Sequence, residues 1–346
     1  MKQIQLTVLL LCAALACACS PKGPPTLTVM THDSFSASET VIRAFEQANN
    51  VHVVFLKSGD AGAALNKAIL SKGAPLADVF YGVDNTFLSR ALEAGIYTPY
   101  DSPLLSRVPV EFRLDPQDRA LPVDYGDICI NYDKAYFSAI ALRIPGSLED
   151  LLKPEFKGLL VVENPATSSP GLGFLLATVK HFGEKGYLDY WQSLRANDVV
   201  IVDGWETAYY TNFSASSGHG PQPLAVSYSS SPAAEVVYAS SPITDAPTAS
   251  ILGPDTCFRQ VEFVGILKGT KHLTLARKFV DFMLSRQFQE DIPLQMFVYP
   301  VNVDASLPKE FTLYAQTAAQ PAMLDPAMIA AERDKWINEW TAIMTR

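Results

Sequence analysis

Two aromatic side chains stand where strand patterns end, and their rings are suited to ligand binding. Trp205 lies in the stretch VDGWETAYYTNF, directly after a strand pattern, and Tyr228 ends the next strand pattern along the chain. Aromatic rings at such positions stack on flat heterocycles and attract cations. Core packing is the alternative for both rings, and the local sequence leaves that choice open.

Carboxylates follow three strand patterns near the N-terminal end of the chain. Asp60 lies in a glycine-rich loop, and Asp33 and Asp84 stand at comparable positions after two other strands. A carboxylate in such a loop can neutralise a cationic ligand. The alternative role for each is to cap a helix, and this alternative is stronger for Asp33 and Asp84 than for Asp60.

The segment TSSPGLG, residues 167–173, stands between a strand pattern and an apolar helix pattern. Ser168 and Ser169 offer hydroxyl groups there. The N-terminus of the following helix offers unpaired N–H groups and a partial positive charge, which favour an anion and especially a phosphate. Simple helix capping by serine, with Pro170 in the first turn, is the alternative.

The adjacent Tyr209 and Tyr210 raise the question of a ferric site. Such a site needs phenolates that converge with carboxylates or imidazoles on one ion. On a helix, neighbouring side chains point about 100° apart, so these two rings are poorly placed to share an ion. The chain has no CxxC or HExxH pattern, and its five histidines are scattered. We therefore expect no metal site.

No set of residues suited to catalysis is visible in the sequence. The pattern Gly-x-Ser-x-Gly is absent, and no histidine stands beside a candidate nucleophile. The run SYSSSP contains Ser231, but a serine without a base donates hydrogen bonds rather than acting as a nucleophile. We therefore expect a binding protein without enzymatic activity or cofactor, in which Ser231 contributes to ligand binding.

Alternating strands and helices position these residues in the first part of the chain. The strand patterns LTVMT, VHVVFLK and LADVFYGV are each followed by a helix pattern. This alternation predicts βαβ units and a parallel sheet, which binds ligands at the carboxyl ends of its strands. The segments at those ends are THDSF, which contains His32 and Asp33, then KSGDAG and GVDN.

Two long strand-like runs, ALPVDYGDICINYDKAYF and CFRQVEFVGILKGT, enclose a second set of strands and helices. We predict an α/β fold with a discontinuous first lobe at 27–122 plus 262–346 and an inserted second lobe at 123–261. The two runs would be hinge crossovers, and a ligand cleft between the lobes would close by hinge motion. In the last helix pattern Trp336 and Trp340 share one apolar stripe, which favours packing over ligand binding.

The N-terminal segment indicates export. Lys2 and the short apolar run LTVLLLCAALACAC resemble a bacterial lipoprotein signal at 1–19, followed by a polar linker at 20–26. We expect lipidation at Cys19 (or Cys17), and a plain cleaved signal peptide is the alternative. Two exported α/β lobes joined by two crossings are typical of a solute-binding protein.

Cysteine content and charge narrow the remaining choices. Of the five cysteines, only Cys129 and Cys257 lie outside the signal, and either a disulfide or two buried thiols fits their apolar surroundings. The net charge of −9 and the lack of any Lys/Arg run exclude a nucleic-acid partner.

These features together resemble the periplasmic thiamine-binding proteins of bacterial thiamine ABC transporters. The matching segments are LTVMTHDSF, ADVFYGVDN, PVDYGDICINYDK, NPATSSPGLGFLL, DGWETAY, SYSSSPA, FVYPVNV and ERDKWINEW, in order from residue 27 to residue 340. The resemblance implies a type II periplasmic binding protein fold and thiamine, thiamine monophosphate or thiamine diphosphate as ligand. It also implies permease subunits as partners. With the N-terminal signal, we expect a monomer in the periplasm that is tethered to the membrane by a lipid anchor.

The resemblance further implies roles for single residues. Asp60 would pair with the cationic side of the ligand, Ser168 would contact its hydroxyethyl or phosphate end, and Trp205 and Tyr228 would form part of an aromatic and polar cage. Asp84 and Tyr125 lie in matching cleft segments.

The chain departs from the family pattern at several cage positions. His32 replaces a usual Tyr, Ala234 replaces a second stacking Tyr, Phe297 replaces a Trp, and the Trp shortly after DSF has no counterpart. Tyr238 or Phe258 would fill the gap, or the ligand differs. Another small solute on the same fold, such as ferric ion, a polyamine or a phosphonate, is the alternative.

Overall fold

The computed structural model describes residues 23–215 and 219–345. The predicted signal peptide, with its lipidation at Cys19 or Cys17, lies outside the described residues, as does the first part of the linker. Within the described ranges no helix combines the length and the apolar character that a membrane span requires.

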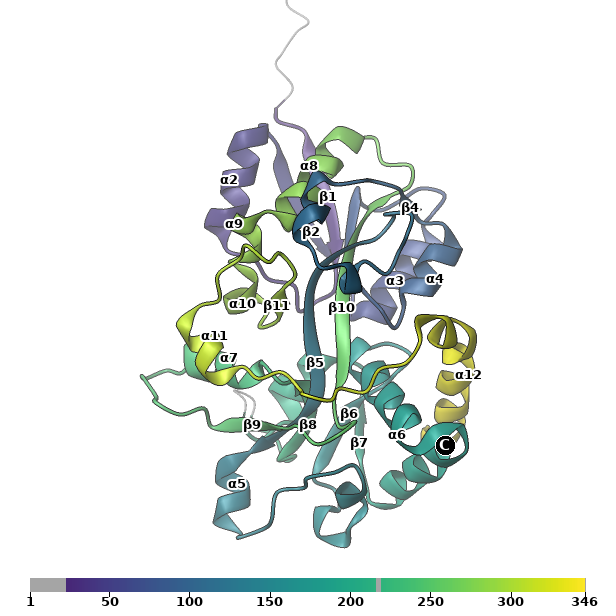
Figure 1. Ribbon diagram of the computed structural model, residues 1–346, viewed down its shortest axis with the longest axis vertical. Helices are drawn as coiled ribbons and strands as arrows, with labels where there is room; N and C mark the ends of the chain where they lie inside the picture. The colour runs from purple at the N-terminus through teal and green to yellow at the C-terminus, as the bar shows by residue number, and fades with distance from the viewer. Residues whose placement is uncertain (1–22, 216–218, 346) are drawn as a thin grey trace, which may run out of the picture.

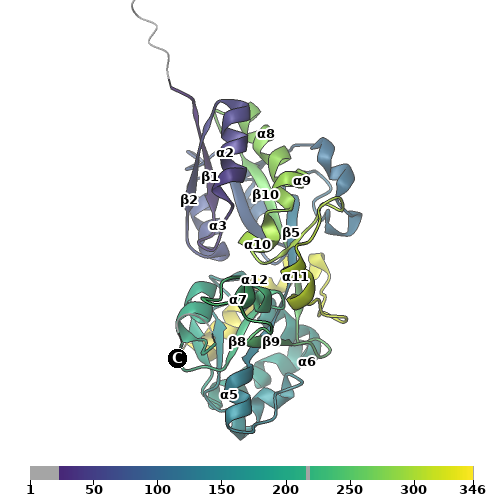
Figure 2. The same cartoon turned by 90° about the vertical axis from the view of Figure 1, so that its left-hand side faces the viewer.

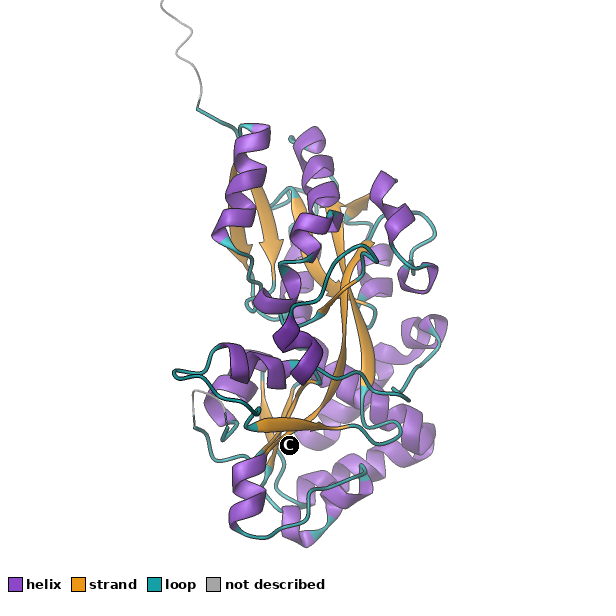
Figure 3. Ribbon diagram, turned by 60° about the vertical axis from the view of Figure 1, so that its left-hand side comes forward, coloured by secondary structure: helices purple, strands orange, loops and turns teal. Residues whose placement is uncertain are grey.

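Two α/β lobes are built on one continuous mixed sheet (Figure 1). The strand order is β2-β1-β3-β10-β5-β8-β6-β7, with the short strands β4, β9 and β11 attached at the sides. Strands β5 (Leu121–Asp133) and β10 (Phe258–Leu267) stand at the centre and run through both lobes (Figure 3). They pair antiparallel from Leu121 opposite Val264 to Ile128 opposite Phe258. This arrangement confirms the predicted two-lobe fold with two strand crossovers.

The first lobe forms around the parallel strands β1, β2 and β3, which alternate with helices as the sequence predicts. Every residue of β3 is buried, since helices cover both faces of the sheet. Helix α2 buries Ile42 and Phe45, and the Phe45 ring packs on Phe279 of α8 with ring centroids 5.2 Å apart. The elements of this lobe are β1 (Thr26–Thr31), α2 (Glu39–Asn49), β2 (His52–Lys57), α3 (Ala61–Leu70), β3 (Val79–Asp84), α4 (Leu88–Ala94), β4 (Tyr97–Thr98), the 3₁₀ turns Pro103–Arg107 and Val110–Phe112, α8 (Leu273–Leu284), α9 (Arg286–Gln289), α10 (Ile292–Gln295) and β11 (Tyr299–Pro300).

The second lobe extends the sheet with β8, β6 and β7, which are parallel to one another. Helix α6 is long and changes direction at Gly183, whose φ of 69° lies in the left-handed region that glycine adopts at no steric cost. The elements are α5 (Lys134–Ala139), the 3₁₀ turns Glu149–Leu152 and Pro154–Phe156, β6 (Leu160–Glu163), α6 (Ser169–Ala196), β7 (Val200–Val202), a π-helical turn at Thr207–Asn212, β8 (Leu224–Tyr228), α7 (Ser231–Val237) and β9 (Thr248–Ile251).

The C-terminal part of the chain departs from the predicted division, which assigns all of 262–346 to the first lobe. Helices α11 (Lys309–Tyr314) and α12 (Pro326–Met344) pack against α7 and α6, both elements of the second lobe (Figure 2). The apolar stripe of α12 explains this placement. Trp336 and Trp340 are fully buried, and Trp340 meets Trp191 of α6 edge to face with ring centroids 5.5 Å apart. Both tryptophans are therefore packing residues, as the sequence predicts.

Cys129 and Cys257 form a disulfide, which decides between the two alternatives that the sequence leaves open. Cys129 lies on β5 and Cys257 directly precedes β10, and both are fully buried. The bond therefore ties together the two crossing strands at the point where they enter the second lobe.

Candidate ligand-binding site

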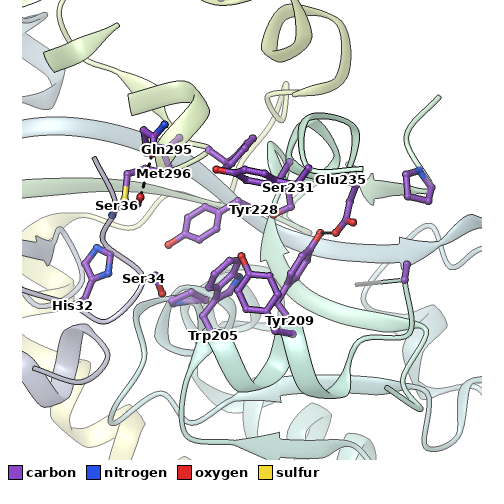
Figure 4. Close-up of a pocket in the computed structure, with 18 of the residues that line it drawn as sticks. His32, Ser34, Ser36, Trp205, Tyr209, Tyr228, Ser231, Glu235, Gln295 and Met296 are labelled. Atoms are coloured by element: carbon purple, nitrogen blue, oxygen red, sulfur yellow. Dashed lines mark hydrogen bonds between the residues drawn. The ribbon is translucent and has the colours of Figure 1, made fainter. Parts of the chain in front are cut away.

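A cavity of about 750 Å³ lies between the two lobes. Its walls come from both of them, and Figure 4 shows His32 on one side with Trp205 and Tyr209 on the other. Six of the ten predicted ligand-binding residues line it: His32, Asp60, Ser169, Trp205, Tyr228 and Ser231. The fold thus brings together residues that are almost 200 positions apart in the sequence, as the strand-end pattern predicts.

Asp60 connects the two lobes at the edge of the cavity. It caps α3, where its Oδ1 accepts a hydrogen bond from Ala61 N at 2.8 Å, and its Oδ2 accepts one from Trp205 N at 3.2 Å. Loss of water around the carboxyl raises its pKa, and the nearby Ser168 hydroxyl opposes that shift. Asp60 therefore serves as a helix cap and also faces the cavity.

Two glycines allow the lobes to approach each other closely beside Asp60. A Cβ on Gly204 would lie 3.2 Å from Asp60 Oδ2, and a Cβ on Gly62 would lie 2.9 Å from the carbonyl oxygen of Ala166. Gly62 N also donates a hydrogen bond to Thr167 O at 3.1 Å. The glycine before Trp205 thus leaves room for the close contact between the lobes.

Trp205 is both a packing residue and a wall of the cavity. One face of its ring stacks on Tyr209, with centroids 5.2 Å apart and planes inclined by 15°, and its Nε1 donates to Ser227 Oγ at 2.9 Å. The ring is only partly buried, and it lines the cavity together with Tyr228, whose ring centroid is 6.5 Å away. The two alternatives for this residue therefore both hold.

Tyr209 and Tyr210 follow Trp205 on a π-helical turn, and their rings lie nearly at right angles to each other. The Tyr209 hydroxyl donates to Glu235 Oε1 at 2.8 Å, whereas the Tyr210 ring is 46% exposed. Among the described residues no His, Cys, Asp and Glu side chains are grouped so as to hold a metal ion.

The N-terminus of α6 offers free polar groups to the cavity. The hydroxyls of Ser168 and Ser169 are buried and lack a well-oriented hydrogen-bond partner, although Ser168 lies near the Asp60 carboxyl and Ser169 near that of Asp84. Ser169 and Pro170 line the cavity, and Ser168 lies behind them as the N-cap residue. A ligand oxygen placed there would meet hydroxyl donors and the positive end of the helix dipole.

Three other predicted residues lie outside the cavity wall. Asp33 holds two loops together by accepting a hydrogen bond from Gly59 N at 2.8 Å. Asp84 is buried and its Oδ1 accepts from Thr86 N at 2.6 Å, so it stabilises the turn before α4. Tyr125 is stacked between Phe112 and Tyr299, away from the cavity. The capping alternative comes close for Asp84, which holds the turn before α4, whereas Asp33 caps no helix, since Ser38 is the N-cap residue of α2.

His32 lies over a group of buried acidic side chains below the cavity. It is 6% exposed, and burial lowers the pKa of its imidazole to about 4. Its Nε2 lies 3.5 Å from Oε1 of Glu262, which also lines the cavity. Gly82 provides the room for this ring, because a Cβ there would lie 2.4 Å from His32 Cδ2.

A further aromatic wall closes the outer side of the cavity. The rings of Tyr238 and Phe297 meet edge to face with centroids 5.5 Å apart, and the Tyr238 hydroxyl donates across the lobes to Leu294 O at 3.3 Å. The Ser230 hydroxyl donates a hydrogen bond to the carbonyl oxygen of Phe297. The backbone of Phe297 has a φ of 53°, in the left-handed region. Phe258, by contrast, is buried in the core away from the cavity.

The cavity wall carries acidic but no strongly basic side chains. Asp60, Glu235 and Glu262 line it, whereas neither Lys nor Arg does so within the described part of the chain. Burial keeps the His32 imidazole neutral near pH 7, so it adds no positive charge. Such a wall favours a cation, and the surrounding rings favour a flat one.

A family profile decides the broader assignment. The profile of the bacterial extracellular solute-binding proteins matches residues 74–319. The chain belongs to this family. A curated relative supports the same conclusion: the thiamine-binding periplasmic protein of Salmonella typhimurium is 32% identical over 99% of this chain and 98% of its own length.

Solved structures of other periplasmic binding proteins have the same fold as this solute-binding protein. A periplasmic thiamin binding protein superposes with a TM-score of 0.81 and 30% identity, over 93% of this chain and 97% of that one. The periplasmic binding protein AfuA from Actinobacillus pleuropneumoniae, bound to fructose-6-phosphate, reaches 0.78 at 22% identity, over 93% and 99%. The second likeness shows the fold alone, and the first confirms the family predicted from the sequence motifs.

Two of the acidic residues that line the cavity of this solute-binding protein were not predicted from the sequence. Glu262 lies inside the run QVEFVG, where a charged residue interrupts an otherwise apolar strand pattern, and that interruption was its available signal. Glu235 follows SSSPAA on α7 and reads as an ordinary exposed helix residue. It was detectable only through its contact with Tyr209.

Proposed function

We propose that this chain is the substrate-binding component of an ABC importer and that it binds thiamine or a phosphate ester of thiamine between its lobes. The observation that carries the proposal is the acidic cavity wall, with its aromatic faces and without Lys or Arg among the described lining residues. Thiamine joins a permanently cationic thiazolium ring to a flat aminopyrimidine, which is the chemistry that such a wall favours. The thiamine-binding relatives support the same ligand.

The arrangement of the walls supports one orientation of the ligand. The thiazolium would lie near the carboxyl groups of Asp60 and Glu262, and the aminopyrimidine would stack on Trp205 and Tyr228. The hydroxyethyl group or its phosphate would then point to Ser168 and Ser169 at the N-terminus of α6. Ser231 offers a further hydroxyl, which lies 2.9 Å from Ser227 Oγ.

Tyr238 and Phe297 would replace part of the aromatic cage that the family pattern leads one to expect. Ala234 leaves space in the wall, and the Tyr238 and Phe297 rings line the same cavity. Met296 lines it as well, and its flexible thioether adapts to a flat ring.

The protein would carry out no chemistry and would need no cofactor. The named relatives are binding proteins, and a two-lobe protein of this family would deliver its ligand to permease subunits. The relatives also support a periplasmic location. We further propose that it acts as a monomer and that a lipid at Cys19 or Cys17 tethers it. The lipid tether rests on the N-terminal sequence alone.

Thermal unfolding in the presence of candidate ligands tests the proposal. A ligand at 100 times its dissociation constant adds about 2.7 kcal/mol to the free energy of unfolding, which raises the midpoint by several degrees. We expect this shift with thiamine, thiamine monophosphate or thiamine diphosphate. Ferric citrate, spermidine and fructose 6-phosphate should leave the midpoint unchanged, and a shift with one of these alone would overturn the thiamine assignment in favour of that ligand class.

A further inference from the structure

Three side chains from adjacent strands form a compact group at the floor of the cavity. The hydroxyl of Tyr81 on β3 lies 2.7 Å from Oδ2 of Asp124 and 3.0 Å from Oε2 of Glu262. Asp124 on β5 and Glu262 on β10 stand directly opposite each other in the antiparallel pair that crosses between the lobes. All three are buried, and Glu262 lines the cavity.

Hydrogen-bond counting favours an additional proton on this group. A phenol has one O–H and can donate to only one carboxylate. The second short contact is then either a repulsion between two oxygen atoms or a hydrogen bond that a protonated carboxyl donates to the phenol oxygen. Two ionised carboxylates this close, in a buried site, are strongly disfavoured, so one of them carries a proton.

The groups that face Glu262 from neighbouring elements add no positive charge. Asp124 and Tyr81 adjoin it, Asp84 stands opposite it on β3, and the rings of Tyr228 and His32 complete the surroundings. Burial raises the pKa of the Asp124 carboxyl to about 7 and that of Glu262 well above its usual range, whereas it lowers the pKa of His32 to about 4.

Two basic side chains of this region are engaged with other groups. Arg259 on the same strand forms an ion pair with Asp127, and Lys57 donates to the carbonyl oxygen of Asp33 at 2.6 Å. In the described ranges, neither Asp124 nor Glu262 forms an ion pair with a lysine or arginine. The carboxyl pair therefore has no cation of its own until a ligand supplies one.

We propose that Asp124 and Glu262 share one proton in the unliganded protein and that a cationic ligand binds in exchange for this proton. The inference rests on the proposed function and identifies Glu262 as a residue that selects for charge. A fixed positive charge beside Glu262 stabilises the ionised carboxylate, so the proton leaves for the solvent as the ligand enters. A neutral ligand of the same shape gains no such stabilisation.

Calorimetric titration of the whole protein with thiamine hydrochloride in two buffers tests this exchange. The buffers are PIPES and ACES at about pH 7.5. At this pH the aminopyrimidine of free thiamine is uncharged, so a proton that is released comes from the protein. Both buffers are zwitterionic and do not compete with the ligand as cations. Their ionisation enthalpies differ, so the difference between the two observed binding enthalpies gives the number of protons released. We expect the release of between about one half and one proton for each thiamine bound. The dissociation constant should increase by up to about tenfold for each pH unit by which the pH is lowered.

Two variants locate the source of the proton. Glu262→Gln keeps the size of the side chain, and we expect it to abolish the buffer dependence and to weaken thiamine binding by at least about tenfold. Glu155→Gln is the control, because Glu155 is exposed and lies outside the cavity; it should keep the wild-type proton release. Proton release that survives in Glu262→Gln, or that vanishes in Glu155→Gln, overturns the proposal.

The wild-type titration distinguishes the inference from the function on which it rests. If thiamine binds with equal enthalpy in both buffers and with an affinity that does not change with pH, the exchange is wrong and the proposed function stands. If thiamine does not bind at all, the proposed function fails first. The wild-type measurement needs no variant, so poor folding of Glu262→Gln would not leave the question open.

Discussion

Single residues at this site combine a structural role with a role in the cavity. Asp60 caps α3 and also accepts a hydrogen bond from the opposite lobe, and Trp205 packs on Tyr209 while its ring lines the cavity. A substitution at either position therefore changes both the ligand wall and the contact between the lobes. For this reason each test of such a residue needs a stability measurement beside the binding measurement.

Replacement of Trp205 by alanine should weaken thiamine binding by about 1–3 kcal/mol, because the ligand loses a stacking face. Calorimetric titration of the variant gives the change in affinity. Trp205→Phe is the matched control, since it keeps an aromatic face and loses only the hydrogen bond to Ser227, and it should retain most of the affinity. An unchanged affinity in the alanine variant, together with a lower unfolding temperature, would show that Trp205 is a core residue only.

Glu163 offers a test of the buried carboxyl groups outside the cavity. It ends β6, is fully buried, and has no hydrogen-bond partner for either carboxylate oxygen in the described structure. Burial, with the nearby Asp60 charge, raises its pKa well above the usual range. The folded protein thus keeps a proton that the unfolded chain has lost, so the contribution of this group to stability is largest at low pH and falls as the pH rises towards the folded pKa.

Glu163→Gln removes this titration and should flatten the pH dependence of stability. In wild type the group contributes a loss of about 1.4 kcal/mol per pH unit over the window above its unfolded pKa. Urea unfolding of both proteins between about pH 5 and about pH 8 measures the difference. The exposed Glu155→Gln is the control and should follow wild type. Equal slopes for wild type and Glu163→Gln would contradict this account.

The sequence predicted some cavity residues and missed others, depending on where each residue lies within its strand or helix. Asp60, Trp205 and Tyr228 stand at strand ends, where the topology of a parallel sheet brings side chains together, so their position was readable. Glu262 and Glu235 lie inside a strand and a helix, and nothing in their local sequence tells which face meets the cavity. Tyr125 was read from a motif, but stacking on Phe112 and Tyr299 holds its ring elsewhere.

At the scale of elements, the two crossing strands and their disulfide set the geometry between the lobes. Cys129 and Cys257 are 128 positions apart, and their bond closes the whole inserted lobe into one loop. A cross-link over so long a loop restricts the unfolded chain more than it changes the folded one. The alternation of strands and helices predicted this insertion, whereas the disulfide needed the register of β5 against β10.

Replacement of both cysteines by alanine should lower the free energy of unfolding by about 2–4 kcal/mol. Urea unfolding under oxidising conditions measures the loss. Wild type unfolded in the presence of a reductant separates the effect of the cross-link from that of the missing sulfur atoms. A double variant as stable as oxidised wild type would contradict the structural role of this bond.

Tyr238 joins the end of α7 to the α10 region across the lobes. Tyr238→Ala should weaken thiamine binding by about 0.5–1.5 kcal/mol, because the outer aromatic wall is lost. Tyr238→Phe keeps the ring and loses only the hydrogen bond to Leu294 O, so it should lie close to wild type. Equal affinities of the alanine variant and wild type, measured by titration, would remove Tyr238 from the site.

The whole molecule is a pair of lobes that enclose a cavity lined with acidic side chains and aromatic rings. Periodicity predicted the lobes and their crossovers, but it placed the C-terminal segment on the wrong lobe. The apolar stripe of α12 shows only that this helix packs against some other element of the chain. The surface around Trp191 of α6 that receives it forms only when the chain folds. The same limit applies to the cavity, since its floor is built from three strands that are distant in the sequence.

Calorimetric titration of the purified mature protein with thiamine tests the proposed binding most directly. We predict saturable binding at one site per chain with a dissociation constant below about 10 μM, which corresponds to a binding free energy of about −7 kcal/mol or more favourable. A folded protein that shows no binding of thiamine, thiamine monophosphate or thiamine diphosphate in that range would contradict the central claim.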